Sequence, residues 1–351
     1  MKKNNDSAIS LIALVITIIV LLILAGITIS LTVGQDGILK RAQEAGKNYT
    51  NAADYEREQL AEFTNQTENI INGLSGNKEE LQYKMVDGVP VPKGFTYIEG
   101  TKETGFVIKD ITTNADGTST ATNGNEFVWI PVKNMNYEYA RVKWTDNASN
   151  SVSYNSCSED LPEDEKKSIQ KYGGFYIGRY ETGIIGYDET VKKDNSKSEE
   201  EWTGYTNGTC VIQKNKQVWN YITWKKAKIE AEKLYDNIVK SKLCSSYAWD
   251  TTLQFIKTQF ETYPTNSTGG CYGTSNPSVT GFEENPPCNL YDMGGNVNEW
   301  TTEQNGSKYV YRGGGHYDSN PALKPASSRW GGSITDVYSS LGFRVALYIK
   351  E

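Results

Sequence analysis

The sequence contains few of the residues from which most catalytic and metal sites are built. It has one histidine, His316, and five cysteines with no C-x-x-C pair among them. Thioredoxin-like motifs and zinc fingers depend on such pairs, so neither is indicated. The single histidine follows three glycines, which favours an exposed loop over the fixed base that a hydrolytic triad needs.

Clusters of basic residues are lacking as well. The formal net charge is −7 and the pI is about 5.1. Nucleic-acid binding depends on clustered Lys and Arg, so we expect no nucleic-acid partner. The sequence is instead rich in glycine (32), tyrosine (23) and tryptophan (8), a composition typical of a folded protein with many turns.

The cysteines leave two interpretations open. If the domain is exported, Cys271 and Cys288 are the most plausible disulfide pair because they are closest in sequence. The alternative is that all five cysteines are small buried residues.

An uncharged apolar stretch runs from Ile9 to Leu31. At about 1.5 Å per residue it is long enough to cross a hydrocarbon core of about 30 Å, and it exceeds the 7 to 15 apolar residues of a cleavable signal peptide. Lys2 and Lys3 precede it and favour a cytoplasmic N-terminus. We therefore predict a single-pass helix in the cell membrane with the C-terminal part outside.

This stretch resembles the prepilin-type N-terminal segment of type IV pilins and pseudopilins. The resemblance implies a leader of residues 1–8 and processing between Ala8 and Ile9, with Ala8 in place of the usual Gly. The family's Glu at the fifth mature position is replaced by Ala13. This departure favours simple membrane anchoring over incorporation into a pilus, although a minor pilin remains an alternative.

Residues 32–80 are polar, with apolar residues spaced by three, four and seven positions. This spacing predicts an amphipathic helical stalk that continues the membrane helix of residues 9–31. Gly76 interrupts the pattern and indicates a boundary near residue 80. We expect one large domain over residues 81–351.

The large domain contains patterns for both strands and helices. Runs rich in aromatic and β-branched residues predict strands at 127–132 and 174–181. Helical spacing of apolar residues predicts helices at about 223–240 and 246–262. After residue 263 the sequence is rich in loop formers. The expected class is therefore α+β with long ordered loops.

Three blocks in the C-terminal part resemble the formylglycine-generating enzyme, or sulfatase-modifying factor, family. They are NLYDMGGNVNEW at 289–300, YRGGGHY at 311–317 and LGFRVAL at 341–347, and FVWIPV, FYIGRYETG, WNYITWKKA and SSYAWDTTLQF agree in order. The resemblance covers residues 82–350 and implies an irregular C-type-lectin-like fold.

The same resemblance argues against the family's activity. Its enzymes use a pair of cysteines, copper-binding in the oxygen-dependent members, between the second and third of these blocks. No cysteine occurs between Arg312 and Arg344. A thiolate is needed to hold copper, so we expect neither copper nor catalysis.

The GNVNEW block has a further implication. Family members bind calcium there, and the match nominates the Glu299 side chain with the carbonyls of Gly295 and Val297. Oxygen ligands suit Ca²⁺. The alternative is that Glu299 is a structural residue hydrogen-bonded to nearby backbone.

The interval between Arg312 and Arg344 is rich in Tyr, Ser, Gly, Asp and Trp, the residue types that antibody loops use for contact. It resembles the variable region of retroelement-diversified proteins, which use a C-type-lectin-like scaffold. The alternative is an ordinary surface loop. In either case we expect its residues to contact a ligand, an extracellular protein or glycan, or solvent. The candidate binding residues are His316, Tyr317, Asp318, Trp330, Gly331, Gly332, Ser333, Asp336, Tyr338, Ser339 and Ser340.

Overall fold

A computed structural model describes residues 16, 82–113, 119–144, 151–187 and 208–351. The chain divides into two units, Met1–Glu80 and Leu81–Glu351, and the second contains nearly all of the described residues. The membrane span predicted at 9–31, apart from Ile16, and the stalk predicted at 32–80 lie outside the described residues. Among the residues that the structure describes, we find no helix that combines the length and the apolar character needed to cross a membrane.

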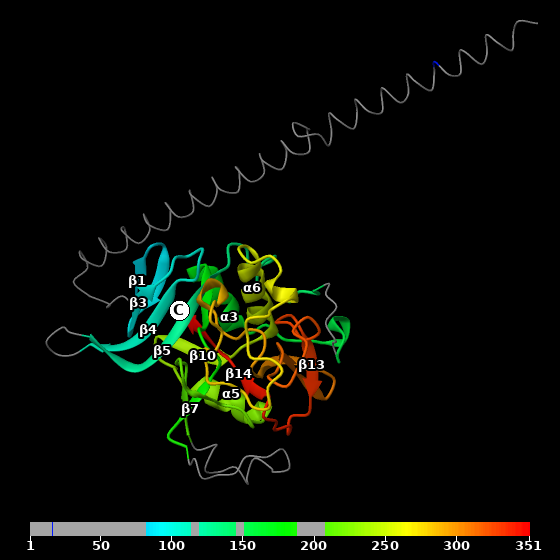
Figure 1. Cartoon of the computed structure of the whole chain (residues 1–351). Coiled ribbons are helices and arrows are strands. Elements are labelled where there is room, and N and C mark those ends of the chain that lie inside the picture. Colours follow the sequence, from blue (N-terminus) through cyan, green and yellow to red (C-terminus); the bar gives the residue numbers. More distant parts are fainter. Residues whose placement is uncertain (1–15, 17–81, 114–118, 145–150, 188–207) are drawn as a thin grey trace, which may run out of the picture. The chain divides into compact units, whose positions relative to one another are not determined.

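The second unit is built around a six-stranded antiparallel sheet in the order β10-β15-β6-β5-β4-β3 (Figure 1). Its strands are β3 (Phe95–Glu99), β4 (Val107–Thr113), β5 (Ser119–Pro131), β6 (Gly174–Gly178), β10 (Val239–Leu243) and β15 (Val345–Ile349). The strands predicted at 127–132 and 174–181 lie at the centre of this sheet as β5 and β6, but β5 begins earlier, at Ser119, and β6 ends earlier, at Gly178.

Three smaller sheets accompany the central one. A four-stranded sheet has the order β13-β12-β11-β14, in which the β11–β14 pair is parallel. Its strands are β11 (Asn298–Asn305), β12 (Lys308–Arg312), β13 (Arg329–Gly332) and β14 (Leu341–Phe343). The other two sheets contain β1 (Tyr83–Val86) with β2 (Val89–Pro92), and β7 (Gly183–Ile185) between β8 (Thr209–Val211) and β9 (Gln217–Val218).

Helices cover both faces of the central sheet. The α-helices are α3 (Glu163–Tyr172), α5 (Trp224–Lys233) and α6 (Ser246–Lys257), and single 3₁₀ turns are η1 (Tyr154–Ser156), η3 (Tyr263–Thr265) and η4 (Pro287–Asn289). The side chains of Thr223 and Ser245 each accept a hydrogen bond from a backbone N–H of the first turn, and so begin α5 and α6. The predicted α+β class is confirmed.

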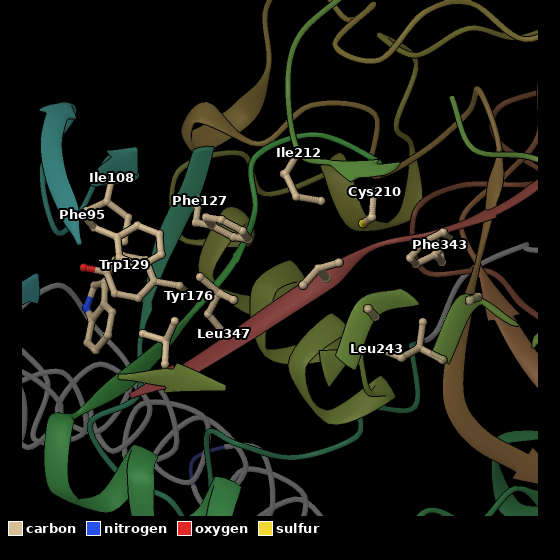
Figure 2. Close-up of a cluster of buried hydrophobic side chains, with 14 of the residues drawn as sticks. Phe95, Ile108, Phe127, Trp129, Tyr176, Cys210, Ile212, Leu243, Phe343 and Leu347 are labelled. Atoms are coloured by element: carbon tan, nitrogen blue, oxygen red, sulfur yellow. The ribbon is translucent and has the colours of Figure 1, made fainter. Parts of the chain in front are cut away.

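The core has two layers because alternate residues of a strand point to opposite faces. Phe127 and Trp129 of β5 pack in one buried cluster with Ala227 of α5. Figure 2 shows Phe127 and Trp129 with Tyr176 and Leu347 of the same cluster. Val128 and Ile130 of the same strand pack in the other cluster. That second layer includes Trp249, Leu253 and Ile256 of α6. A strand that is buried on both faces explains the continuous apolar run FVWI.

Both predicted helices end earlier than expected. The spacing predicted a helix to residue 240, but α5 ends at Lys233 and β10 begins at Val239. Residues Val239–Leu243 pair along their length with β15, so sheet pairing overrides the local helical pattern. Similarly, α6 ends at Lys257, and Phe260 is exposed.

Candidate functional site

Two loops of the four-stranded sheet contain most of the predicted binding residues, and Trp330, Gly331 and Gly332 lie in β13 between them. One leaves β12 at Arg312 and returns at Arg329 in β13, where the two arginines are register partners. The other leaves β13 at Gly332 and returns in β14 at Leu341, beside Asn298 of β11. Since all four strands are hydrogen-bonded neighbours, the sheet brings both loops to one part of the domain.

Buried ion pairs fix the ends of the first loop. The Arg312 guanidinium is fully buried, and its Nη2 lies 2.6 Å from Oδ1 of Asp250 on α6. Arg329 binds Oδ2 of the same carboxylate at 2.9 Å and Oε2 of Glu303 at 2.8 Å. Burial opposes ionisation of Asp250, but the two guanidinium groups outweigh it and lower its pKa. The two arginines therefore hold both ends of the loop to α6 and β11.

A third buried arginine follows the second loop. Arg344 donates two hydrogen bonds to the Glu299 carboxylate through Nε and Nη2, at 2.9 and 2.6 Å, and a third from Nη2 to the carbonyl of Tyr291 at 2.9 Å. Both Arg344 and Glu299 have exposed fractions of 0%. Burial raises the pKa of Glu299, and the adjacent guanidinium opposes the rise. Glu299 is thus bound to a side chain and not, as the structural alternative predicted, to nearby backbone.

This pairing bears directly on the calcium prediction. Both carboxylate oxygens of Glu299 already accept from Arg344. Across the described ranges, no group of three or more His, Cys, Asp or Glu side chains is placed to hold a metal. The residues fit an ion pair better than a calcium site, and calcium at Glu299, Gly295 and Val297 stays a prediction.

His316 is buried, with an exposed fraction of 1%, so the expectation of an exposed histidine was wrong. The physical reason is the glycine run before it. A Cβ on Gly314 would lie 2.3 Å from the Lys324 carbonyl oxygen, and a Cβ on Gly315 would lie 2.8 Å from Nδ2 of Asn298. Only glycine allows this close approach, which draws the chain inward.

The hydrogen bonds of His316 define its tautomer. Its Nδ1 lies 2.9 Å from the carbonyl oxygen of Thr274, and a carbonyl only accepts, so Nδ1 carries the proton in the neutral ring. Nε2 is buried and has no hydrogen-bond partner among the described residues. His316 belongs to the wall beneath the loops and not to their outer surface.

The remaining candidates divide into exposed and inward-facing residues. Tyr317 and Tyr338 are the most open aromatic side chains, with exposed fractions of 55% and 41%. Asp318 turns inward, where its Oδ2 accepts from the N–H of Gly315 at 2.8 Å. Gly332 and Ser340 are buried. The outward set, named the 316–340 face, consists of Tyr317, Trp330, Gly331, Ser333, Asp336, Tyr338 and Ser339.

Tyr311, which the sequence analysis did not nominate, lies at the centre of these residues. Burial raises the pKa of its hydroxyl, and four neighbouring groups raise it further: Tyr317, Asp336, Tyr338 and Asp318. A Cβ on Gly332 would lie 2.9 Å from Oδ2 of Asp336 and 3.2 Å from Cε1 of Tyr311. Residues from both loops therefore surround one tyrosine of β12.

Lys324 is a second residue that the sequence analysis missed. Its Nζ lies 3.1 Å from the ring centroid of Trp330 and 3.8 Å from Oδ1 of Asp318. This cation–π contact fixes the indole ring at the edge of the 316–340 face. The only signal in the sequence was its place inside the candidate interval, since a lone lysine indicates no contact by itself.

The five cysteines all lie in the described part of the chain, and all are buried and unpaired. Of the two interpretations left open by the sequence, the structure has the small buried residues and not a Cys271–Cys288 disulfide. Burial raises the pKa of the Cys288 thiol to about 12, and it also raises those of Cys210 and Cys244. Their thiols are poor sources of thiolate at neutral pH.

Comparisons with known proteins find similar solved structures and one matching family model. No curated protein sequence matches the chain. Among solved structures, the chain is similar to the crystal structure of CarF (16% identity, 50% of this chain and 87% of the other, TM-score 0.33). It is similar to PvdO from Pseudomonas aeruginosa (16% identity, 65% and 96%, TM-score 0.38) and to Treponema denticola variable protein 1 (14% identity, 73% and 99%, TM-score 0.25).

A family model gives the assignment for part of the chain. Residues 240–349 match the model described as "Sulfatase-modifying factor enzyme 1-like domain". This range includes β10, α6, the four-stranded sheet and β15, and the mixed α+β architecture fits a formylglycine-generating-enzyme-like, C-type-lectin-like domain. The C-terminal region of the chain therefore carries a sulfatase-modifying factor enzyme 1-like domain.

Proposed function

We propose that the chain is a membrane-anchored binding protein that presents this domain on the outside of the cell. In this proposal residues 9–31 cross the membrane, residues 32–80 form a stalk, and the 316–340 face binds an extracellular protein or glycan without catalysis. The apolar stretch from Ile9 to Leu31 supports the anchor.

The observation that supports the binding role most strongly is that the interval from Arg312 to Arg344 combines buried arginines with exposed tyrosines. Arg312, Arg329 and Arg344 are buried in ion pairs, whereas Tyr317 and Tyr338 are exposed by 55% and 41%. Exposed tyrosines on a fixed scaffold provide large contact area with little loss of conformational entropy. A rigid frame with an open aromatic surface is suited to recognition.

The absence of catalysis rests on the cysteines. No cysteine lies between Arg312 and Arg344, where the family's enzymes have their reactive pair. The cysteines elsewhere in the chain are buried. A copper-dependent oxidation of the family's type lacks the thiolates that it requires.

The test is a binding screen of the full-length chain against arrays of glycans and of secreted proteins. A ligand of the 316–340 face should bind at least tenfold more weakly to Tyr338→Ala, because an exposed contact residue is removed without affecting the core. Tyr97→Ala is the matched control, since Tyr97 is 37% exposed and lies on β3, away from β13 (Figure 1).

Two results would contradict the proposal. One is that every ligand binds Tyr338→Ala, and a second variant Trp330→Ala, as strongly as the unchanged chain. The other is formylglycine production from a cysteine-containing sulfatase peptide in the presence of copper, which would show that the chain is an enzyme.

A further inference from the structure

A cleft elsewhere on the surface shares no residue with the 316–340 face. The cleft has a volume of about 560 Å³ and is formed by the segment before residue 145 and by the C-terminal part of α6. Sites for small ligands usually have volumes of about 300 to 1,000 Å³. The lining residues are Tyr137, Ala140, Arg141, Val142, Lys143, Trp144, Gln254, Lys257 and Thr258.

The charge of this cleft is opposite to that of the whole chain. Arg141, Lys143 and Lys257 line it, and no Asp or Glu among the described residues does, although the chain carries a net charge of −7. Over the described part of the chain, neither Lys143 nor Lys257 has a carboxylate within 4.0 Å. Two lysines without an ion-pair partner on one recessed surface produce a local positive potential that attracts an anion.

Hydrogen bonds to Asp250 fix Trp144 and the backbone of Val142 at the cleft. Asp250 accepts a hydrogen bond from Nε1 of Trp144 at 3.0 Å and another from the N–H of Val142 at 2.9 Å. Lys257 lies 5.9 Å from the Trp144 ring centroid. Tyr137, at 78% exposed, is the most open large apolar side chain at the cleft. Because the indole ring is already fixed, a ligand that stacks on it does not lose binding energy to ordering it.

Arg141 is also oriented before any ligand binds. Its Nη1 donates to Oε1 of Glu303 and to the carbonyl of Cys157, and its guanidinium lies 5.1 Å from the ring centroid of Tyr154. These contacts fix the guanidinium plane, which therefore offers directional N–H groups to a carboxylate, in contrast to the flexible lysines.

We infer that this cleft binds a short acidic oligosaccharide whose sugar rings carry carboxylates. The apolar face of each ring would stack on Trp144 and Tyr137, and the carboxylates would pair with Lys143, Lys257 and Arg141. An acidic glycan satisfies both features of the lining, the aromatic rings and the two lysines that have no ion-pair partner among the described residues. A nucleic acid would need a longer run of basic residues to compete with the overall negative charge.

The experiment is calorimetric titration of the full-length chain with a trimer of galacturonic acid at low salt, with the neutral galactose trimer as the comparison ligand. The acidic trimer should bind and the neutral trimer should not, and added salt should weaken binding. The double variant Lys143→Ala and Lys257→Ala should bind at least tenfold more weakly. Lys84→Ala, an exposed lysine on β1, is the matched control and should bind normally.

Several outcomes would overturn the inference. They are the absence of binding at millimolar trimer, equal binding of both trimers, unchanged binding by the double variant, and tighter binding of a single-stranded oligonucleotide of the same charge. Tyr338→Ala separates this inference from the proposed function. If it abolishes trimer binding while the lysine variant does not, the sugar occupies the 316–340 face and the cleft is not its site.

Discussion

Replacing Arg329 by Met tests whether buried arginines carry the frame beneath the 316–340 face. The substitution removes the bonds from Arg329 to Asp250 and Glu303 at 2.9 and 2.8 Å. Both carboxylates keep one arginine, since Arg312 still pairs with Asp250 and Arg141 with Glu303. Breaking a buried ion pair costs about 3 to 5 kcal/mol. Because each carboxylate keeps one arginine, we expect a loss at the low end of this range, about 3 kcal/mol.

The assay is urea unfolding of the full-length chain followed by tryptophan fluorescence. Arg329→Met should lower the free energy of unfolding by about 3 kcal/mol, whereas Tyr338→Ser, at an exposed position of the same interval, should change it by no more than about 0.5 kcal/mol. The reasoning fails if Arg329→Met costs less than about 1 kcal/mol, or if the two variants are equally destabilised. Either result would mean that the buried arginine pairs contribute no more to stability than the exposed residues of the same interval.

Three further predictions concern buried groups around the site. Burial, followed by repulsion from Glu303, raises the pKa of Glu159 to about 8, so the folded chain keeps a proton that the unfolded chain releases near pH 4.5. As the pH rises between these values, the free energy of unfolding should therefore fall by about 1.4 kcal/mol per pH unit. In Glu159→Gln, the urea midpoint should depend less on pH between about pH 5 and 8. Gly314→Ala should lower the free energy of unfolding by about 1 to 3 kcal/mol in the same assay, because its Cβ would meet the Lys324 carbonyl oxygen at 2.3 Å. Calcium in excess over chelator should leave the melting temperature unchanged, because Arg344 occupies the Glu299 carboxylate; a rise that Glu299→Gln abolishes would restore the predicted metal site.

The sequence was sufficient to predict the parts of the fold that depend on local patterns. The strands at 127–132 and 174–181 were predictable because long aromatic and β-branched runs leave few alternatives. The starts of α5 and α6 were also predictable, since apolar spacing begins just after Thr223 and Ser245. The end of α5 was not, because the pairing of β10 with β15 joins residues about a hundred positions apart.

The candidate site was predicted only in part, for a similar reason. The interval between Arg312 and Arg344 was identified, but which of its residues face outward depends on contacts with other segments. His316 is buried because Gly314 approaches the Lys324 carbonyl, and Tyr311 is central because two loops converge on it. Neither fact has a signature in local sequence. The anchor predicted at 9–31 and the processing predicted at Ala8 and Ile9 stay predictions.

The burial of the motif residues also limits what the family resemblance can say about function. Glu299, Trp300, Arg312 and Arg344 carry the resemblance, and each has an exposed fraction of 0%. These buried residues stabilise the fold. A resemblance to the family at these positions therefore indicates a shared fold and does not identify a ligand. Residues such as Tyr338 can change without disturbing those ion pairs, so the same frame can present different surfaces. The ligand must therefore be identified by binding measurements on variants of the exposed residues, with the 316–340 face and the cleft tested separately.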